Sequence, residues 1–235
     1  NAEGEVVALI QKNSDKESTS SYAIGIGYAK SLSINALSAN DFTLNTIGIK
    51  KGLPEDESQA LVYLYVSSSN LSKEEYLNLL NEFIQQYPKN SEGYSRRALC
   101  YMGYGDDAHY ALAEKDLQTM VEVNENKGDA YYNLSKLLYN YVLGLQGAKP
   151  YGDWTMERAL KEINTALEND KQGLYYQLQG DIYFAMQKYP EAFASYEAVN
   201  RSPLASAASF YAAAKTKELI EGASKKEAIA LMDSA

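Results

Sequence analysis

Apolar residues along most of this chain recur every three or four positions, the spacing that places them on one face of an α-helix. The pattern is clearest between Ser72 and Pro88. Ser72 is followed three residues later by Glu75, which is the spacing of a capping box, and Pro88 is a helix stop signal. The sequence therefore predicts a helix between these signals. Its apolar face consists of Tyr76, Leu79, Leu80, Phe83 and Ile84.

The predicted helices form pairs that return about every 34 residues, a period typical of a helical repeat array. Three units begin near Glu57, Ser91 and Gly128, a fourth is centred between Tyr176 and Tyr196, and a degenerate fifth follows. A pair has an apolar face that it cannot hide alone, so stacked neighbours complete the core. Small residues that let the helices approach closely recur in these pairs: Ala98, Ala113, Ala159, Gly180 and Ala192.

This Tyr-rich pattern resembles the tetratricopeptide repeat (TPR) family over residues 57–235. The resemblance implies an all-α fold, in which antiparallel helix pairs form a right-handed superhelix of about four to five repeats. It also implies a concave groove lined by the first helix of each pair. Arg97 and Gln179 occupy positions where the family usually has Leu, and Ser135 stands where it usually has Gly.

The same resemblance assigns candidate groove residues that would bind a protein or peptide. Asn and Tyr suit an extended peptide, because the amide pairs with its backbone and the ring offers a flat apolar contact. Asn133 stands where many family members hold a peptide backbone; alternatively, it is simply a common residue of the fold. Arg96, Asn133 and Lys136 would suit the family's carboxylate-binding variant, but Asp181 opposes that role. The candidates are Arg96, Tyr132, Asn133, Lys136, Tyr139, Gln177 and Phe184.

Trp154, the only Trp in the chain, is a further candidate. About a dozen residues beyond the usual repeat length separate the two helices of the third unit, in an insertion over residues 140–155. Insertions in repeat arrays fall on loops and often carry specificity. Trp154 either contacts a partner or packs on its own helices.

Residues 1–56 do not follow the repeat. Residues 1–20 are polar and suggest a tether. Residues 20–53 contain Ser21 to Leu32, then Asp41-Phe42 and Gly48 to Leu53, and resemble the helical N-terminal dimerisation segment of FKBP-type prolyl isomerases. The resemblance implies a helical segment and a homodimer; no isomerase domain follows it. The alternative is an extra helical hairpin that caps the array. The chain is thus divided into residues 1–56, a leader with a helical capping segment, and residues 57–235, the repeat domain.

Charge and composition narrow the function further. A formal net charge of −9 argues against nucleic-acid and anionic-membrane partners. The single cysteine, Cys100, excludes an internal disulfide, and no stretch has the length of a transmembrane helix. The single histidine, His109, is expected in an exposed turn with acidic neighbours. With no coherent catalytic set, we expect no enzyme activity and no cofactor.

These patterns predict a non-catalytic scaffold that binds a protein or peptide in its concave groove. The alternative is a structural or assembly subunit of an extracytoplasmic complex, dimerising through residues 1–56. The chain begins with Asn, as after removal of a signal peptide or lipoprotein leader. This start predicts a periplasmic or outer-membrane-associated protein, with the cytoplasm as the alternative.

Overall fold

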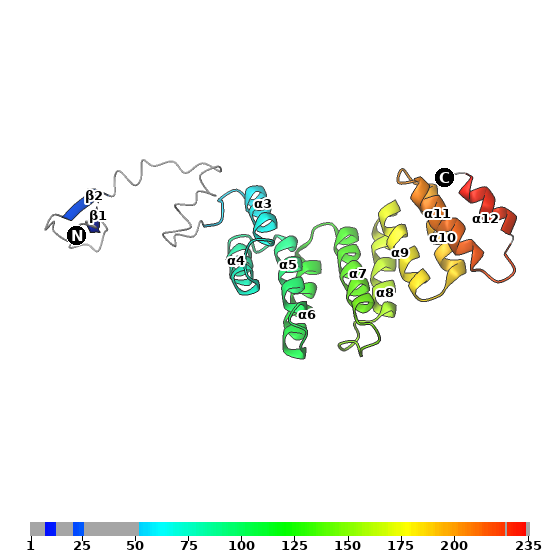
Figure 1. The fold of residues 1–235 in the computed structure, drawn as a ribbon, viewed down its shortest axis with the longest axis horizontal. Helices are drawn as coiled ribbons and strands as arrows, with labels where there is room; N and C mark the ends of the chain where they lie inside the picture. The colour runs from blue at the N-terminus through cyan, green and yellow to red at the C-terminus, as the bar shows by residue number, and fades with distance from the viewer. Residues whose placement is uncertain (1–7, 13–20, 26–51, 224, 234–235) are drawn as a thin grey trace. The chain divides into compact units, whose positions relative to one another are not determined.

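The computed structural model describes residues 8–12, 21–25, 52–223 and 225–233. The chain divides into two compact units, residues 1–52 and 53–235. Every secondary-structure element among the described residues of the second unit is a helix, and Figure 1 shows these helices following one another as pairs. The helices are α3 (Glu57–Ser67), α4 (Lys73–Gln86), α5 (Ser91–Met102), α6 (Asp107–Val123), α7 (Lys127–Gly144), α8 (Met156–Asn169), α9 (Gly173–Ala185), α10 (Tyr189–Asn200), α11 (Ala207–Glu218) and α12 (Lys225–Met232).

Each helix packs on the next, so the second unit is a continuous array of helix pairs. The pairs α5–α6, α7–α8 and α9–α10 pack most extensively. Between pairs, α8 packs on α9 and α10 packs on α11. The first helices α7 and α9 also contact each other directly. The predicted all-α array of helix pairs is therefore confirmed. In the described part of the chain, no helix combines the length and the apolar character that crossing a bilayer requires.

Side-chain caps explain where several of the helices start. The Ser72 hydroxyl accepts a hydrogen bond from the Glu75 backbone N–H (3.3 Å), and the Glu75 carboxylate accepts one from the Ser72 N–H (3.2 Å). This reciprocal pair satisfies two N–H groups that have no partner within the helix, so the predicted capping box is confirmed. Asn90, Asp106 and Thr155 cap α5, α6 and α8 in the simpler one-sided way.

Polar residues link the helices at the positions where the sequence departs from the repeat pattern. Arg97 on α5 donates to Asp116 on α6 at 2.8 and 2.7 Å and to Asn81 on α4 at 2.9 Å. Ser135 on α7 donates to the Ala159 carbonyl on α8 at 2.7 Å. Both links are made inside the array, where a polar group needs a partner to offset its lost hydration.

The N-terminal unit contains a two-stranded antiparallel sheet. Strand β1 (Ala8–Lys12) pairs with β2 (Ser21–Gly25), with Ala8 opposite Gly25. The prediction of a helix beginning at Ser21 is wrong for Ser21–Gly25. Gly25 and Gly27 disfavour a helix, and pairing with β1 supplies the backbone hydrogen bonds that a helix would have made internally. The rest of the predicted segment, including Asp41-Phe42, lies outside the described residues.

Candidate functional site

Exposed large apolar side chains concentrate on the first helices of the pairs. Among the described residues, eight such side chains lie on first helices: Val62, Tyr65 and Val66 on α3, Leu99 on α5, Leu143 on α7, Leu174 and Phe184 on α9, and Tyr211 on α11. The second helices carry Leu112 and Ile229, and the connections carry Tyr104, Leu204 and Leu219. Clustered apolar exposure marks a contact surface, whereas scattered single residues are normal. The first helices are therefore the candidate binding surface.

The first helices α7 and α9 share an aromatic contact within this surface. The rings of Tyr132 on α7 and Tyr175 on α9 stack with centroids 5.1 Å apart and an interplanar angle of 22°. The Tyr175 hydroxyl donates to Asp129 on α7. These contacts hold the two first helices together.

One carboxylate of α9 lies near these helices. Asp181 on α9 accepts hydrogen bonds at Oδ1 from Gln177 Nε2 (3.0 Å) and from the Tyr196 hydroxyl on α10 (2.8 Å). Burial raises the pKa of Asp181. Burial, followed by the nearby charge of Asp181, raises the pKa of both Tyr132 and Tyr139 on α7. We call these five residues the Asp181 cluster.

Several of the other predicted groove residues lie near this cluster. Lys136 is exposed on α7, and its Nζ lies 5.9 Å from the centroid of the Tyr132 ring. Asn133 is half-buried on the same helix. Phe184 is exposed at the end of α9, edge-on to Tyr189 at 5.6 Å. The structure thus brings Tyr132, Tyr139 and Gln177 together and places the others on the same helices.

Arg96 lies apart from the Asp181 cluster, on α5. It forms an ion pair with Glu92 at 2.7 Å, and its guanidinium lies 5.8 Å from the centroid of the Tyr65 ring on α3. It also lines an open cleft of about 390 Å³ together with Tyr76 and Leu99. Arg96 therefore belongs to the first-helix surface of the two N-terminal pairs.

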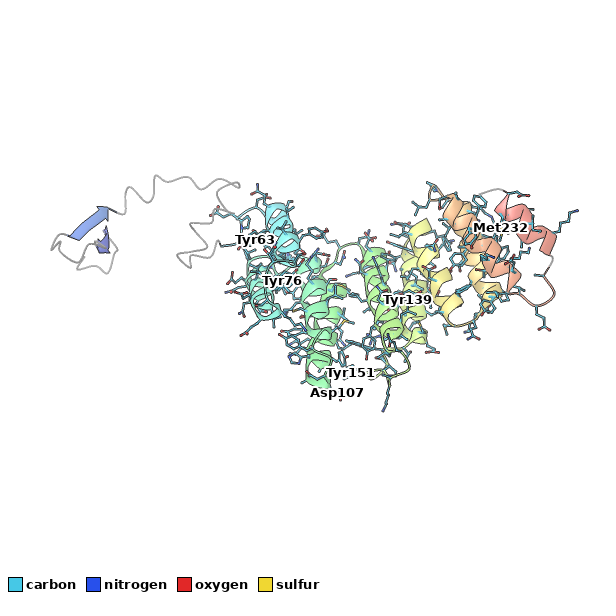
Figure 2. The ribbon with its side chains drawn as sticks, viewed as in Figure 1. Tyr63, Tyr76, Asp107, Tyr139, Tyr151 and Met232 are labelled. Carbon is cyan, nitrogen blue, oxygen red and sulfur yellow. The ribbon has the colours of Figure 1, made fainter. Side chains whose placement is uncertain are left out.

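The Trp154 side chain is buried, with 1% of the residue exposed. Its ring makes edge contacts with Tyr110, Tyr141 and Tyr151 at centroid distances of 5.4, 5.0 and 5.3 Å. Figure 2 shows Tyr151 beside the start of α6, where Asp107 is labelled. A buried ring cannot reach a partner, so Trp154 is corrected from a candidate partner contact to a packing residue of the insertion.

The polar end of Trp154 is part of an ionic network. Its Nε1 donates to Glu114 Oε2 at 2.6 Å, and Arg158 donates to both oxygens of Glu114 at 2.9 and 3.0 Å. Burial alone would raise the pKa of Glu114, but the hydrogen bonds from Arg158, Trp154 and Gln118 outweigh it and lower that pKa. We call this network the Trp154 cluster: Trp154, Glu114, Arg158 and the rings of Tyr110, Tyr141 and Tyr151.

Asp181 and Tyr196 are absent from the predicted site residues, although both belong to the Asp181 cluster. A signal for Asp181 is present in the sequence: α9 (GLYYQLQGDIYFA) contains no Lys or Arg, so the carboxylate has no basic neighbour on its own helix. Tyr196 is harder to find, because it reaches Asp181 from α10.

His109 occupies the first turn of α6 rather than the preceding turn. Its Nδ1 lies 2.7 Å from Asp106 Oδ2, and its ring stacks on Tyr104 at 4.1 Å. Within residues 52–223 and 226–233, no three His, Cys, Asp or Glu side chains are grouped as a metal site would require.

No protein-family model and no curated protein sequence matches this chain, but solved structures do. MamA from Desulfovibrio magneticus RS-1 is 13% identical over 76% of this chain and 93% of its own, with a TM-score of 0.54. The TPR protein TTC0263 from Thermus thermophilus is 16% identical over 77% and 90%, with a TM-score of 0.52. YrrB, described as a TPR protein with an unusual peptide-binding site, is 19% identical over 83% and 90%, with a TM-score of 0.50.

Proposed function

Given that the helical unit has the tetratricopeptide-repeat fold, we propose that this chain is a non-catalytic scaffold that binds an extended segment of a protein partner. The binding surface is the groove lined by α3, α5, α7, α9 and α11. We infer no substrate and no cofactor for this scaffold.

The observation that carries this proposal is the uneven distribution of exposed apolar residues. Eight lie on the first helices and two on the second helices of the described array. Covering apolar surface contributes roughly 25 cal/mol per Å², so a peptide that covers several of these residues gains affinity along the whole groove. YrrB, a protein of similar fold, is described as having an unusual peptide-binding site, which supports peptide binding by an array of this kind.

The α5–α6 pair offers a matched test. Leu99 on α5 is 49% exposed and Leu112 on α6 is 46% exposed, so the two differ mainly in which helix carries them. A groove variant, Leu99→Ser with Phe184→Ser, is compared with a control variant, Leu112→Ser with Ile229→Ser. Both remove two exposed apolar side chains of the array.

Peptides are selected from a displayed random library on the unmodified protein, and their affinities for all three proteins are measured by fluorescence anisotropy. The groove variant should bind about tenfold more weakly or worse, while the control variant stays within about twofold of the unmodified protein. Equal binding by the groove and control variants would rule out the groove.

The alternative, an assembly subunit that dimerises through residues 1–56, stays a prediction, and so does an extracytoplasmic location. Light scattering on the full chain tests the dimer directly. The mass of one chain at all accessible concentrations would dismiss the homodimer, and twice that mass would support it.

A further inference from the structure

Asp181 differs from two other shielded carboxylates of the array, Asp116 and Glu114, in forming no ion pair. Asp116 is paired with Arg97 at 2.7 Å and Glu114 with Arg158 at 2.9 Å. No Lys or Arg among the described residues forms an ion pair with Asp181, although its burial is sufficient to raise its pKa. A carboxylate that has lost part of its hydration without gaining a cation is left with an unmet electrostatic demand.

The hydrogen bonds around Asp181 leave one side of it open. Gln177 and Tyr196 both donate to Oδ1, and no described residue donates to Oδ2. A carboxylate can accept at both oxygens, and a cationic donor gives the shortest and strongest bonds. Oδ2 is therefore available to a donor that comes from outside this part of the chain.

Aromatic side chains are the other groups close to Asp181. Tyr132 and Tyr139 come from α7, and Tyr196 comes from α10. The face of a Tyr ring attracts a cation by its quadrupole. The Tyr132 ring already has a cation near it, because Lys136 Nζ lies 5.9 Å from its centroid. Tyr rings around a carboxylate form a site that suits an ammonium or guanidinium group.

We propose that the Asp181 cluster binds the lysine or arginine side chain of a partner peptide, whose neighbouring residues are apolar. The inference rests on the proposed function, since the peptide must lie along the first helices. The cation pairs with Asp181 Oδ2 between the rings of Tyr132 and Tyr139, and the adjacent apolar side chains contact exposed residues such as Phe184. A formal net charge of −9 favours the approach of such a peptide. An acidic side chain at this site is repelled by Asp181, so the cluster also selects against acidic peptides.

Asp181→Asn is the informative variant, because the Asn carbonyl oxygen can still accept from Gln177 and Tyr196 while the charge is removed. The displayed random library is selected in parallel on the unmodified protein and on Asp181→Asn. The unmodified protein should enrich Lys or Arg at one position relative to the apolar residues. Asp181→Asn should keep the apolar preference and lose the basic one. The same basic enrichment on both proteins, or none on the unmodified protein, would overturn the proposal.

A second measurement uses one recovered peptide and a copy in which norleucine replaces its basic residue. We expect the unmodified protein to prefer the basic peptide by about tenfold and Asp181→Asn to bind both peptides within about twofold. Equal affinities of the unmodified protein for the two peptides would contradict a cation site.

The groove variant, Leu99→Ser with Phe184→Ser, separates the two possible failures. If its binding is weakened but basic residues are not preferred, the cation site is wrong and the scaffold function stands. If no library peptide depends on the groove residues, both the scaffold function and the cation site are wrong.

Discussion

The Trp154 cluster and the Asp181 cluster contain the same kinds of residue but differ in whether the carboxylate is paired with a cation. Each surrounds a carboxylate with Tyr rings, at Glu114 in the first and at Asp181 in the second. The Trp154 cluster also contains Arg158, which lies 2.9 Å from Glu114, whereas the Asp181 cluster contains no basic residue. The first is complete within the chain, and the second is completed, in our proposal, by a partner.

The two carboxylates respond to burial in opposite directions because of this difference. The pKa of Glu114 is lowered, since hydrogen bonds from Arg158 and Trp154 outweigh the effect of burial. The pKa of Asp181 is raised, since its two neutral donors do not outweigh burial. A ring of Tyr side chains around an acid therefore does not identify a binding site; the presence or absence of an internal cation distinguishes the two cases.

The largest expected loss of stability is at Trp154, whose ring contacts three Tyr rings. Trp154→Ala should lower the free energy of unfolding by about 3–5 kcal/mol, because it leaves a cavity and takes a hydrogen bond from Glu114. Urea denaturation measures the change. Leu143→Ala, at an exposed position on α7, is the control and should change it by no more than about 0.5 kcal/mol. Similar losses in both variants would mean that the Trp154 cluster is not a closed structural unit.

A smaller loss is expected at Gly180, which lies against the Asp181 cluster. A Cβ on Gly180 would stand 2.6 Å from Tyr196 Cε1, so the ring must shift and its hydroxyl must move relative to Asp181. Gly180→Ala should therefore lower the free energy of unfolding by about 1–3 kcal/mol. Gly144→Ala on α7 meets no atom within 4 Å and should be neutral or stabilise by up to about 1 kcal/mol. Equal melting temperatures for the two variants would contradict the tight contact.

Glu114→Gln tests the ion pair between Glu114 and Arg158, and we expect it to lower stability as much as Gly180→Ala or less. At neutral pH it should lower the free energy of unfolding by about 1–2 kcal/mol, because hydrogen bonds to a charged acceptor are lost. The pKa of Glu114 is lowered by folding, so its stabilisation is present above the unfolded value and is lost as pH falls through the folded value. Urea denaturation should show the variant and the unmodified protein converging as the pH is lowered. A constant difference would contradict the lowered pKa.

The smallest expected change in stability is at Asp181, where removal of the charge should stabilise the fold instead of destabilising it. The pKa of Asp181 is higher in the folded protein than in the unfolded chain, where an Asp carboxyl has its ordinary value of 3.8. Ionisation of Asp181 therefore destabilises the fold as the pH rises from that ordinary value through the raised pKa. At neutral pH, Asp181→Asn should stabilise the protein by less than about 1 kcal/mol, since water still reaches this side chain. The gain should vanish in acid. A variant that is less stable than the unmodified protein at neutral pH would show that the charge has an internal partner.

The local parts of this fold and site follow from the sequence. The capping box at Ser72 and Glu75 is a contact between near neighbours, and it marks the start of α4 as predicted. Tyr132 and Tyr139 are two turns apart on one helix, so their common face follows from helical period alone.

The parts that escaped prediction depend on residues distant in sequence. Trp154 is buried by Tyr110 on α6 and Tyr141 on α7 as well as by Tyr151 in its own insertion, and no spacing rule brings these together. Ser21–Gly25 is a strand because Ala8–Lys12 pairs with it, and that partner lies in a segment whose composition suggests a tether. In both cases a contact across the chain overrides the local preference.

The polar links inside the array limit how its helices can be recombined. Arg97 bonds to Asn81 on the preceding helix and to Asp116 on the following one. Gln179 links the corresponding helices: it donates to Asn164 at 2.8 Å and accepts from the Ser195 hydroxyl at 2.8 Å. The α5–α6 pair can therefore be exchanged for α9–α10 with an Asn still present on the preceding helix. Exchange of α6 for α10 alone would leave the guanidinium of Arg97 against a serine, without a carboxylate. We therefore expect exchange between these two pairs to succeed only at crossovers between pairs, and a chimera made within one of them should fold poorly even though every helix in it is native.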